Sequence, residues 1–426
     1  MSITITGFDT WDLRFPTSQQ LDGSDAMNPD PDYSAAYVVL RTSSDELCGH
    51  GMTFTIGRGN ELCVAGIQSL ARLLTGTNVE TLMSDPVSLY RRITADSQLR
   101  WTGPEKGVIH LAAAAVINAM WDLWCRIKGQ PLWRLVAEMS PEQFAACVDF
   151  RYLTQSLTSS QAKELLQIHE ATRPARIEQL TDSGYPSYTT SAGWLGYSDK
   201  ELKVKCDDLM QRGWNHFKIK VGRDLDDDLR RCRLLRSVLG PDAKMMVDAN
   251  QVWDVPEAIE WIEQLKEFDP WFVEEPTCPD DILGHAAIAK AVSPIRIATG
   301  EMCHNRIMFR QFMESGGMQV CQLDSCRLGG VNEVLAVMLL AARFRIPVCP
   351  HAGGVGLCEY VQHLSMIDYI SVSGTMQDRI AEYSDHLHEH MKHPVVMKDG
   401  RYMPPTDAGY SVEFLPSALH EFSWHA

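Results

Sequence analysis

Side chains able to do acid–base or metal chemistry recur at similar intervals through the second half of the chain. Each ends or follows an apolar, β-prone run, and the set is Lys218, Lys220, Asp248, Asn250, Glu274, Glu275, Glu301, Asp324, His351 and Glu382. The intervals match one strand plus one helix. If the runs are neighbouring parallel strands of a barrel, their carboxyl ends form one rim, and these side chains meet in one pocket.

Three of these residues are candidate metal ligands. The carboxylates of Asp248, Glu274 and Glu301 end three consecutive runs and form an all-oxygen set. Oxygen ligands suit Mg²⁺ better than Zn²⁺, which is usually held by Cys and His. The sequence therefore predicts a Mg²⁺ site built from these three side chains.

The remaining members of the set suit proton transfer. Lys218 and Lys220 are two positions apart on one run, so both point to the same face of a strand. Two close lysines lower each other's pKa, and a neutral lysine is a base. Asp324 and His351 lie on successive runs, where the carboxylate would fix the tautomer of the imidazole. We therefore expect Lys220 and His351 to act as an acid–base pair.

The elements that must position these groups alternate regularly. Eight β-prone runs, most followed by a helical pattern, cover residues 185–191, 216–221, 244–250, 271–276, 295–301, 320–326, 346–352 and 369–374. Such alternation predicts a parallel sheet with crossover helices, and eight units favour a closed barrel over an open sheet. A dinucleotide-binding sheet is disfavoured, because no GxGxxG motif follows the first run.

The N-terminal part has a different pattern. Strands are expected at 3–15 and 36–42, a long Asp-, Pro- and Gly-rich loop at 20–34, and helices at 61–76, 82–94 and 108–129. Unmixed strands and helices are typical of an α+β domain. We therefore predict an α+β domain at 1–140, a barrel domain at 141–384, and a segment at 385–426 that packs back on the first domain.

Composition limits the possible partners. The 39 basic and 55 acidic residues give a net charge of −16, which disfavours binding to nucleic acid or to an anionic membrane. The most apolar stretch, 111–125, is interrupted by Asn118 and Asp122, and no secretory signal is apparent. The 12 cysteines are scattered without a CxxC pair, which is typical of a reducing compartment. A cytoplasmic protein acting on a small molecule is expected.

Several motifs together resemble the enolase superfamily, in its mandelate racemase-like subgroup. They are FKIKVG, VDANQVW, VEEP, TGE, QLDSCRLGG and PHAGG, with AAAAVINAMWDLWCRIKGQPLWRL in the N-terminal part. The resemblance covers nearly the whole chain and has no departure at any metal or acid–base position. It implies a capping α+β domain on a modified (β/α)₇β TIM barrel of the α/β class, with Mg²⁺ as cofactor, and a homo-oligomer.

The resemblance also implies a reaction. The stretches LDGSDAMNPDPDYSAAYVV and PHAGGVGLCEYVQHLS look like those of family members that dehydrate L-fuconate. In that chemistry Lys220 removes the C2 proton of an acid sugar, Mg²⁺ stabilises the enediolate, and His351, held by Asp324, protonates the departing 3-OH. The product is a 2-keto-3-deoxy acid. Substrate contacts are expected from Lys218, Asn250, Glu382, Asp25, Tyr33 and Trp101, and the pKa of Glu382 is expected to be raised.

Alternatives stay open on the residues alone. A lysine and a histidine around a metal also suit a racemase or epimerase of a 2-hydroxy acid, and a dehydratase could prefer another aldonate. A non-catalytic binding protein on the same scaffold is disfavoured, because a decayed site should lose Lys220, Asp324 or His351 first.

Overall fold

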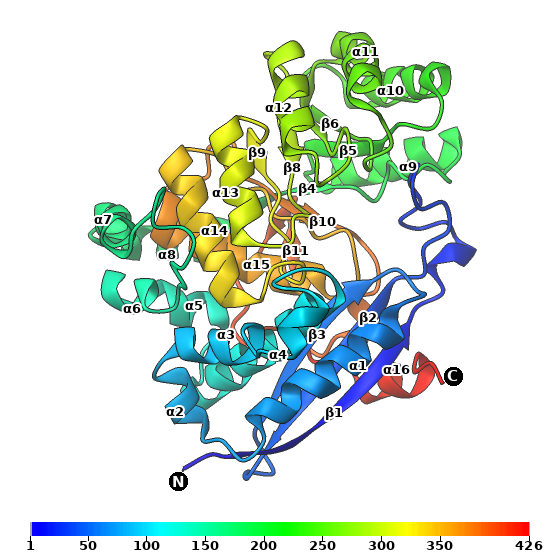
Figure 1. Ribbon diagram of the computed structural model, residues 1–426. Coiled ribbons are helices and arrows are strands. Elements are labelled where there is room, and N and C mark those ends of the chain that lie inside the picture. Colours follow the sequence, from blue (N-terminus) through cyan, green and yellow to red (C-terminus); the bar gives the residue numbers. More distant parts are fainter. Residues whose placement is uncertain (1, 426) are drawn as a thin grey trace.

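The computed structural model describes residues 2–425, which form a cap in contact with a barrel (Figure 1). The cap has an antiparallel sheet of β1 (Ile5–Arg14), β2 (Ser34–Thr42) and β3 (Cys48–Thr55), in that order. Helix α4 (Gly107–Lys128) packs on β3 and β2, and α1 (Asn60–Ala71) packs on α4. Glycine makes this approach possible: a Cβ at Gly51 would lie 2.1 Å from the Ala115 carbonyl oxygen.

Helix α4 is long and apolar enough to cross a membrane by length and composition, and 83% of its most apolar window is buried inside the protein. Its apolar character is explained by its place in the core, between the sheet and the barrel. The other helices before the barrel are η1 (Thr17–Gln19), η2 (Arg72–Leu74), α2 (Val79–Met83), α3 (Pro86–Thr94), η3 (Leu99–Thr102), α5 (Leu132–Ala137), α6 (Pro141–Ala145), α7 (Ser159–Glu170) and α8 (Arg173–Ser183).

The barrel strands are parallel and follow one another in chain order. They are β4 (Tyr185–Thr189), β5 (His216–Lys220), β6 (Lys244–Asp248), β7 (Pro270–Glu274), β8 (Ile297–Thr299), β9 (Val320–Cys321) and β10 (Ala381–Tyr383). Val348, in the segment before β10, bridges Cys321, and Glu382 donates its N–H to the Pro350 carbonyl at 3.2 Å. Since β10 pairs with β4, the ring is closed.

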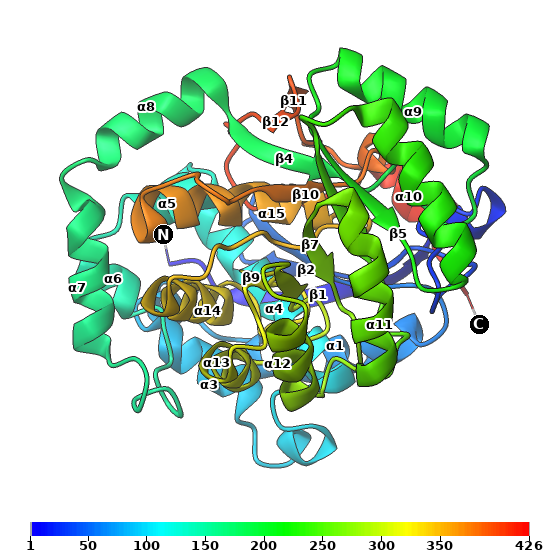
Figure 2. The ribbon, with the colours of Figure 1, turned by 90° about the horizontal axis from the view of Figure 1, so that it is seen from above.

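Helices surround this ring (Figure 2). They are α9 (Asp199–Gln211), α10 (Leu225–Leu239), α11 (Val255–Leu265) with η4 (Lys266–Phe268), α12 (Ile282–Ala291), α13 (Arg306–Ser315), α14 (Val331–Phe344) and α15 (Leu357–Ile367). Each connects one strand segment to the next. The predicted fold, a (β/α)₇β barrel with an α+β cap, is confirmed.

The predicted eighth strand is wrong in position. Residues 369–373 lie in a π-helix, η5 (Asp368–Ser373), which continues α15 without a break, and Gly374 follows it with φ 66°. A short apolar run does not distinguish a buried strand from a buried helical turn, and nothing between α15 and Gly374 stops the helix. The eighth strand is β10, so Glu382 lies within it rather than beyond it.

The C-terminal segment contacts both parts of the molecule. It contains η6 (His388–His390), β11 (Met397–Lys398), β12 (Arg401–Tyr402) and α16 (Pro416–Glu421). Strand β12 pairs with β4 of the barrel, whereas Ser423 bridges Leu13 in the cap. In Figure 1 α16 lies beside β1. The prediction named only the cap as its neighbour.

A buried ionic network fixes the cap to the barrel. Glu333 on α14 contacts His110 of α4 at 2.7 Å and accepts a hydrogen bond from Arg306 at 2.9 Å, and Arg306 also contacts Glu105 at 3.2 Å. Burial alone would raise the pKa of Glu333, but His110 and Arg306 lower it to about 2. Removing one member of such a buried network typically costs about 3–5 kcal/mol, because it leaves a buried charge without its partner.

The burial of His363 predicts that the stability of the protein depends on pH. His363 on α15 is fully buried; its Nδ1 accepts the Trp133 N–H at 3.2 Å, and its Nε2 lies 2.9 Å from Ser411 Oγ. Burial lowers the pKa of His363 to about 3. Because the folded pKa lies below the unfolded value near 6.5, His363 contributes stability above pH 6.5, and that stability is lost as the pH falls toward 3.

We expect His363→Gln to flatten this dependence. The free energy of unfolding of the unsubstituted protein should fall by up to about 1.4 kcal/mol per pH unit more steeply than that of the variant below pH 6.5. Urea unfolding between pH 7 and pH 4 measures both slopes. His393→Gln, at a side chain 25% exposed, is the control. Equal slopes for His363→Gln and His393→Gln would contradict the assignment.

Candidate active site

The carboxyl ends of the barrel strands hold the predicted groups together. Lys220, Asp248 and Glu274 end β5, β6 and β7, and the register pairs Lys220 with Asp248 and Asp248 with Glu274. A cavity of about 350 Å³ opens at this rim between barrel and cap. The predicted residues that line it are Lys220, Asn250, Glu301, Asp324, His351, Glu382, Asp25 and Tyr33.

Both lysines are buried among carboxylates. Lys218 Nζ lies 2.8 Å from Glu274, 2.8 Å from Glu382 and 3.2 Å from Asp248. Lys220 Nζ donates to Asp248 at 2.6 Å and to Asn250 Oδ1 at 2.9 Å. Burial alone would lower the pKa of Lys220, but Asp248 raises it above its ordinary value. In this arrangement Asp248, the direct partner of Lys220, favours the charged lysine, and a neutral Lys220 beside a bound cation stays a prediction.

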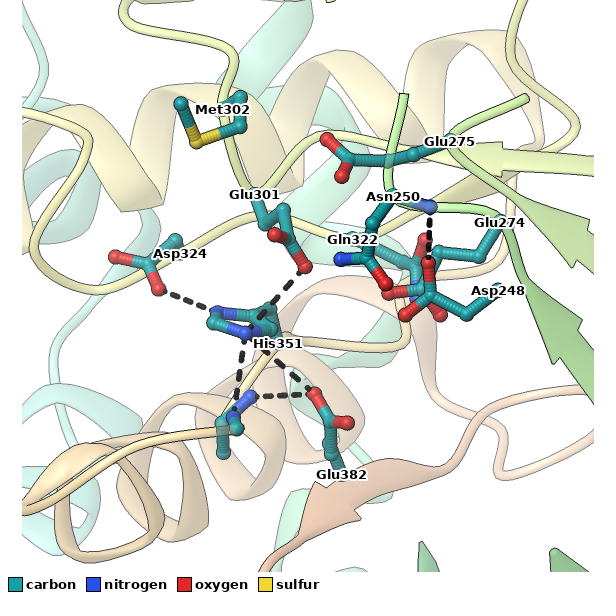
Figure 3. Close-up of polar contacts among 12 residues, drawn as sticks. Asp248, Asn250, Glu274, Glu275, Glu301, Met302, Gln322, Asp324, His351 and Glu382 are labelled. Atoms are coloured by element: carbon teal, nitrogen blue, oxygen red, sulfur yellow. Dashed lines mark hydrogen bonds and ion pairs between the residues drawn. The ribbon is translucent and has the colours of Figure 1, made fainter. Parts of the chain in front are cut away.

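His351 and Asp324 form the predicted pair (Figure 3). His351 Nδ1 lies 2.7 Å from Asp324 Oδ2, and Nε2 lies 3.4 Å from Glu301 and faces the cavity. Burial disfavours a charged ring, but Glu301 and the hydrogen bond to Asp324 raise the pKa of His351 to about 10. In this arrangement the imidazole is protonated near neutrality and can act as an acid.

Glu382 differs from its prediction. It accepts the Ala352 N–H at 2.9 Å and lies 2.8 Å from Lys218 Nζ. Burial would raise the pKa of Glu382, but Lys218 and His351 lower it below its ordinary value. The expected raised pKa is wrong, because the sequence did not show that Lys218 would point directly at this carboxylate.

The donor set fits a hard divalent cation, although Asp248 and Glu274 contact lysines and Glu301 lies 3.4 Å from His351. Within residues 2–425 no three His, Cys, Asp or Glu side chains are gathered as ligands around one point. Lys218 lies between Asp248 and Glu274, and burial together with Asp248 raises the pKa of Glu274 to about 8. The carbonyl Oε1 of Gln322, drawn beside Asn250 in Figure 3, is buried without a partner. Crowded carboxylates and an unpaired carbonyl are groups that Mg²⁺ binds.

Two predicted cap residues reach the cavity. Asp25 lines it and also accepts the Met27 N–H at 2.8 Å, so it both fixes its own turn and faces the site. Tyr33 is 4% exposed and its ring stacks on His386 at 5.3 Å. The loop that carries them is bound to the barrel, because Leu195 N–H donates to the Ser24 carbonyl at 3.0 Å. The cap loop therefore forms part of the cavity wall.

Trp101 is a wrong prediction. Its side chain is 91% exposed in η3, and it lines a separate surface hollow with Arg100, Arg151 and Tyr152. The segment between α3 and α4 runs over the outside of the cap, so an aromatic residue there faces solvent. Sequence position within the cap did not reveal which side of the domain this segment covers.

Several residues of the cavity wall were missed, among them Trp194 and Gln251. Trp194 follows β4, lies with its ring 5.5 Å from Lys220 Nζ, and has a buried indole N–H without a partner. Gln251 follows Asn250 in the loop after β6 and also lines the cavity. Both lie in loops that follow strand ends, Trp194 after β4 and Gln251 after β6. The sequence signal that could have identified them is this position just beyond a β-prone run, including the first run.

Comparison with protein families agrees with this geometry. Residues 201–418 match the model described as "Enolase C-terminal domain-like", and residues 30–137 match the "Mandelate racemase / muconate lactonizing enzyme, N-terminal domain". The chain belongs to the enolase superfamily. The resemblance inferred from the motifs is confirmed at this level.

Individual members of the superfamily are similar over the whole chain. L-galactonate dehydratase of Hypocrea jecorina is 53% identical over 99% of this chain and 94% of its own. The crystal structure of human mitochondrial enolase superfamily member 1 has a TM-score of 0.98 and 51% identity, over 99% and 97% of the two chains. L-talarate dehydratase of Polaromonas sp. JS666, solved with Mg and L-glucarate, shares the fold at a TM-score of 0.74 and 22% identity, over 100% and 98%.

Proposed function

We propose that this protein of the enolase superfamily dehydrates an acid sugar, with L-fuconate preferred, to a 2-keto-3-deoxy acid. The observation that carries the proposal is that one cavity is lined by both Lys220 and the Asp324-held His351. A base and an acid on separate strand ends can serve C2 and the 3-OH of one substrate. The similarity to L-galactonate dehydratase supports the reaction type.

The preference for L-fuconate has chemical support. L-Fuconate is 6-deoxy-L-galactonate, so the two acids differ only at C6. The cavity wall includes the apolar side chains of Met27, Phe54, Ile56 and Leu111, although Asn28, Thr55, Arg58 and Arg327 also line it. The apolar part of the wall suits a terminal methyl group better than a hydroxyl, because a buried hydroxyl needs a hydrogen-bond partner.

The residues would act in sequence. Lys220 takes the C2 proton, and the 3-OH leaves as water with a proton from His351 Nε2. Asp324 holds Nδ1 of His351 at 2.7 Å and thereby fixes which nitrogen delivers the proton. The enol that remains tautomerises to the 2-keto acid. Lys218 is buried beside Glu382 and is not among the residues that line the cavity, so it would act on the substrate carboxylate through its positive charge.

Asp248, Glu274 and Glu301 are the residues that would hold Mg²⁺. When bound there, Mg²⁺ would supply Lewis-acid stabilisation of the negative charge that builds on the substrate carboxylate. A cation held there would compete with Lys220 for Asp248, the carboxylate that contacts Lys220 Nζ at 2.6 Å, and would thereby favour the neutral, basic form of the lysine. The cytoplasmic location, the homo-oligomer and the absence of nucleic-acid or membrane partners stay predictions.

Incubation with a panel of acid sugars tests the proposal. We expect 2-keto acid from L-fuconate and, less efficiently, from L-galactonate, with Mg²⁺ present. EDTA should lower the rate by about 100-fold or more, since Lewis-acid stabilisation is worth several kcal/mol, and excess Mg²⁺ should restore it. Deuterium exchange at C2 without a keto product would instead indicate a racemase or epimerase. Turnover that persists in EDTA would contradict the metal assignment.

A further inference from the structure

The loops after β6 and β7 are held together by two hydrogen bonds between the same two residues. Gln251 N–H donates to the Glu275 carbonyl at 2.8 Å, and Gln251 Nε2 donates to Glu275 Oε2 at 2.6 Å. Both residues have positive φ, 70° for Gln251 and 43° for Glu275. Non-glycine residues rarely adopt this conformation, and facing strained positions at a strand rim indicate that the arrangement serves the site.

Glu275 has no role in the proposed reaction. Its side chain is fully buried, and no Lys, Arg or His of the described residues lies within ion-pair distance of it. Figure 3 shows its carboxylate apart from those of Asp248 and Glu382. Its Oε1 has no hydrogen-bond partner, so Gln251 is its one side-chain partner in the described part of the chain.

Gln251 has one end free for a ligand. Nε2 is committed to Glu275, which directs the other end of the amide away from that contact. Oε1 accepts no hydrogen bond from any described residue, and Gln251 lines the cavity beside Lys220 and Asn250. An amide oxygen is an acceptor for O–H or N–H donors. The carboxylates nearby are already engaged, Asp25 by its turn and Asp324 by His351.

We propose that Gln251 Oε1 accepts a hydrogen bond from a hydroxyl group of the acid sugar, and that Glu275 is the positioning residue that fixes this amide. The inference rests on the proposed function, because it takes the ligand to be a polyhydroxy acid. Gln251 then determines specificity for a hydroxylated substrate. Glu275 acts through Gln251 and touches neither substrate nor metal.

The test uses the Mg²⁺-loaded protein and three variants. Gln251→Leu removes the acceptor, Glu275→Leu removes its support, and Glu275→Gln keeps an oxygen that can still accept from Gln251. L-Fuconate affinity is measured by calorimetry, KM and kcat by 2-keto acid formation, and Mg²⁺ affinity by a separate titration. Gln211→Leu, on the exposed end of α9, is the matched control.

We expect Gln251→Leu and Glu275→Leu to weaken L-fuconate binding and raise KM by about 10-fold, as for one lost hydrogen bond, with kcat changed less than about 3-fold. Glu275→Gln should bind like the unsubstituted protein, and all three should keep its Mg²⁺ affinity. If Glu275→Leu does not fold, as judged by circular dichroism, Gln251→Leu and Glu275→Gln still decide the matter.

The outcomes separate the two proposals. Unchanged affinity in Gln251→Leu, or lost Mg²⁺ affinity in Glu275→Gln, overturns the inference and leaves the proposed reaction intact. Binding of L-fuconate without turnover overturns the reaction, while the affinities of the variants still test Gln251. If the unsubstituted protein binds no acid sugar, both proposals are overturned.

Discussion

Lys220→Ala is expected to lower dehydration of L-fuconate by about 10³- to 10⁴-fold while Mg²⁺ binding stays within about 3-fold of normal. General base catalysis contributes rate factors of this size, and Lys218, the other lysine beside Asp248, is not among the residues that line the cavity. The side chain lines the cavity, and its Nζ contacts Asp248 and Asn250. Alanine removes the base and also removes one positive charge from beside Asp248. Loss of that charge favours cation binding at Asp248, so the substitution is not expected to weaken Mg²⁺ binding.

The measurement combines 2-keto acid formation with a direct Mg²⁺ titration. Lys203→Ala, at an exposed position of α9, controls for the loss of a lysine as such and should retain full activity. Near-normal turnover by Lys220→Ala would remove Lys220 as the base. Loss of Mg²⁺ binding in parallel would show that the lysine organises the ligand carboxylates, which is a structural role and not a chemical one.

Much of this site could be predicted from the sequence because a barrel places strand ends in a circle. Lys220, Asp248 and Glu274 end successive strands, and the register brings each beside the next. No knowledge of side-chain conformation is needed for that step. The pairing of Asp324 with His351 follows equally, since both lie just beyond neighbouring strand ends.

What could not be predicted depends on direction and packing. The segment 369–373 is helical because it continues α15, and a strand-like composition does not reveal such continuity. Trp101 lies outside the cap because its loop covers the outer face. The pKa of Lys220 is raised because Lys220 contacts Asp248, and the pKa of Glu382 is lowered because Lys218 contacts Glu382. Residue types alone do not decide which lysine contacts which carboxylate.

The two halves of the reaction use different groups, and this separates dehydration from racemisation. In the proposed reaction Lys220 alone would serve C2, whereas elimination would also need a proton at the 3-OH. His351 is fixed for that task by Asp324 on Nδ1, while Nε2 lies 3.4 Å from Glu301 at the cavity wall. Removing the imidazole should therefore block the second half of the reaction more than the first.

His351→Asn is expected to lower 2-keto acid formation by about 10³-fold while exchange of the C2 proton with deuterium continues. Asparagine can still bond to Asp324 but has no acidic nitrogen to deliver to the 3-OH. Proton exchange is followed by NMR in D₂O with L-fuconate and Mg²⁺, and product by the keto-acid assay. His393→Asn, a partly exposed histidine paired with Asp407 at 3.3 Å, is the matched control and should be fully active.

The same two measurements, C2 exchange and keto-acid formation, distinguish the dehydratase from a racemase and from a structural role of His351. A racemase that used His351 as its second base would lose inversion at C2 and form no keto product before or after substitution. Loss of exchange together with elimination would show that His351, which lies between Glu301 and Glu382, also organises the substrate complex through those carboxylates. Only persistence of exchange with loss of product assigns the elimination step to the His351 imidazole, because the C2 proton then still reaches Lys220 in a correctly assembled site.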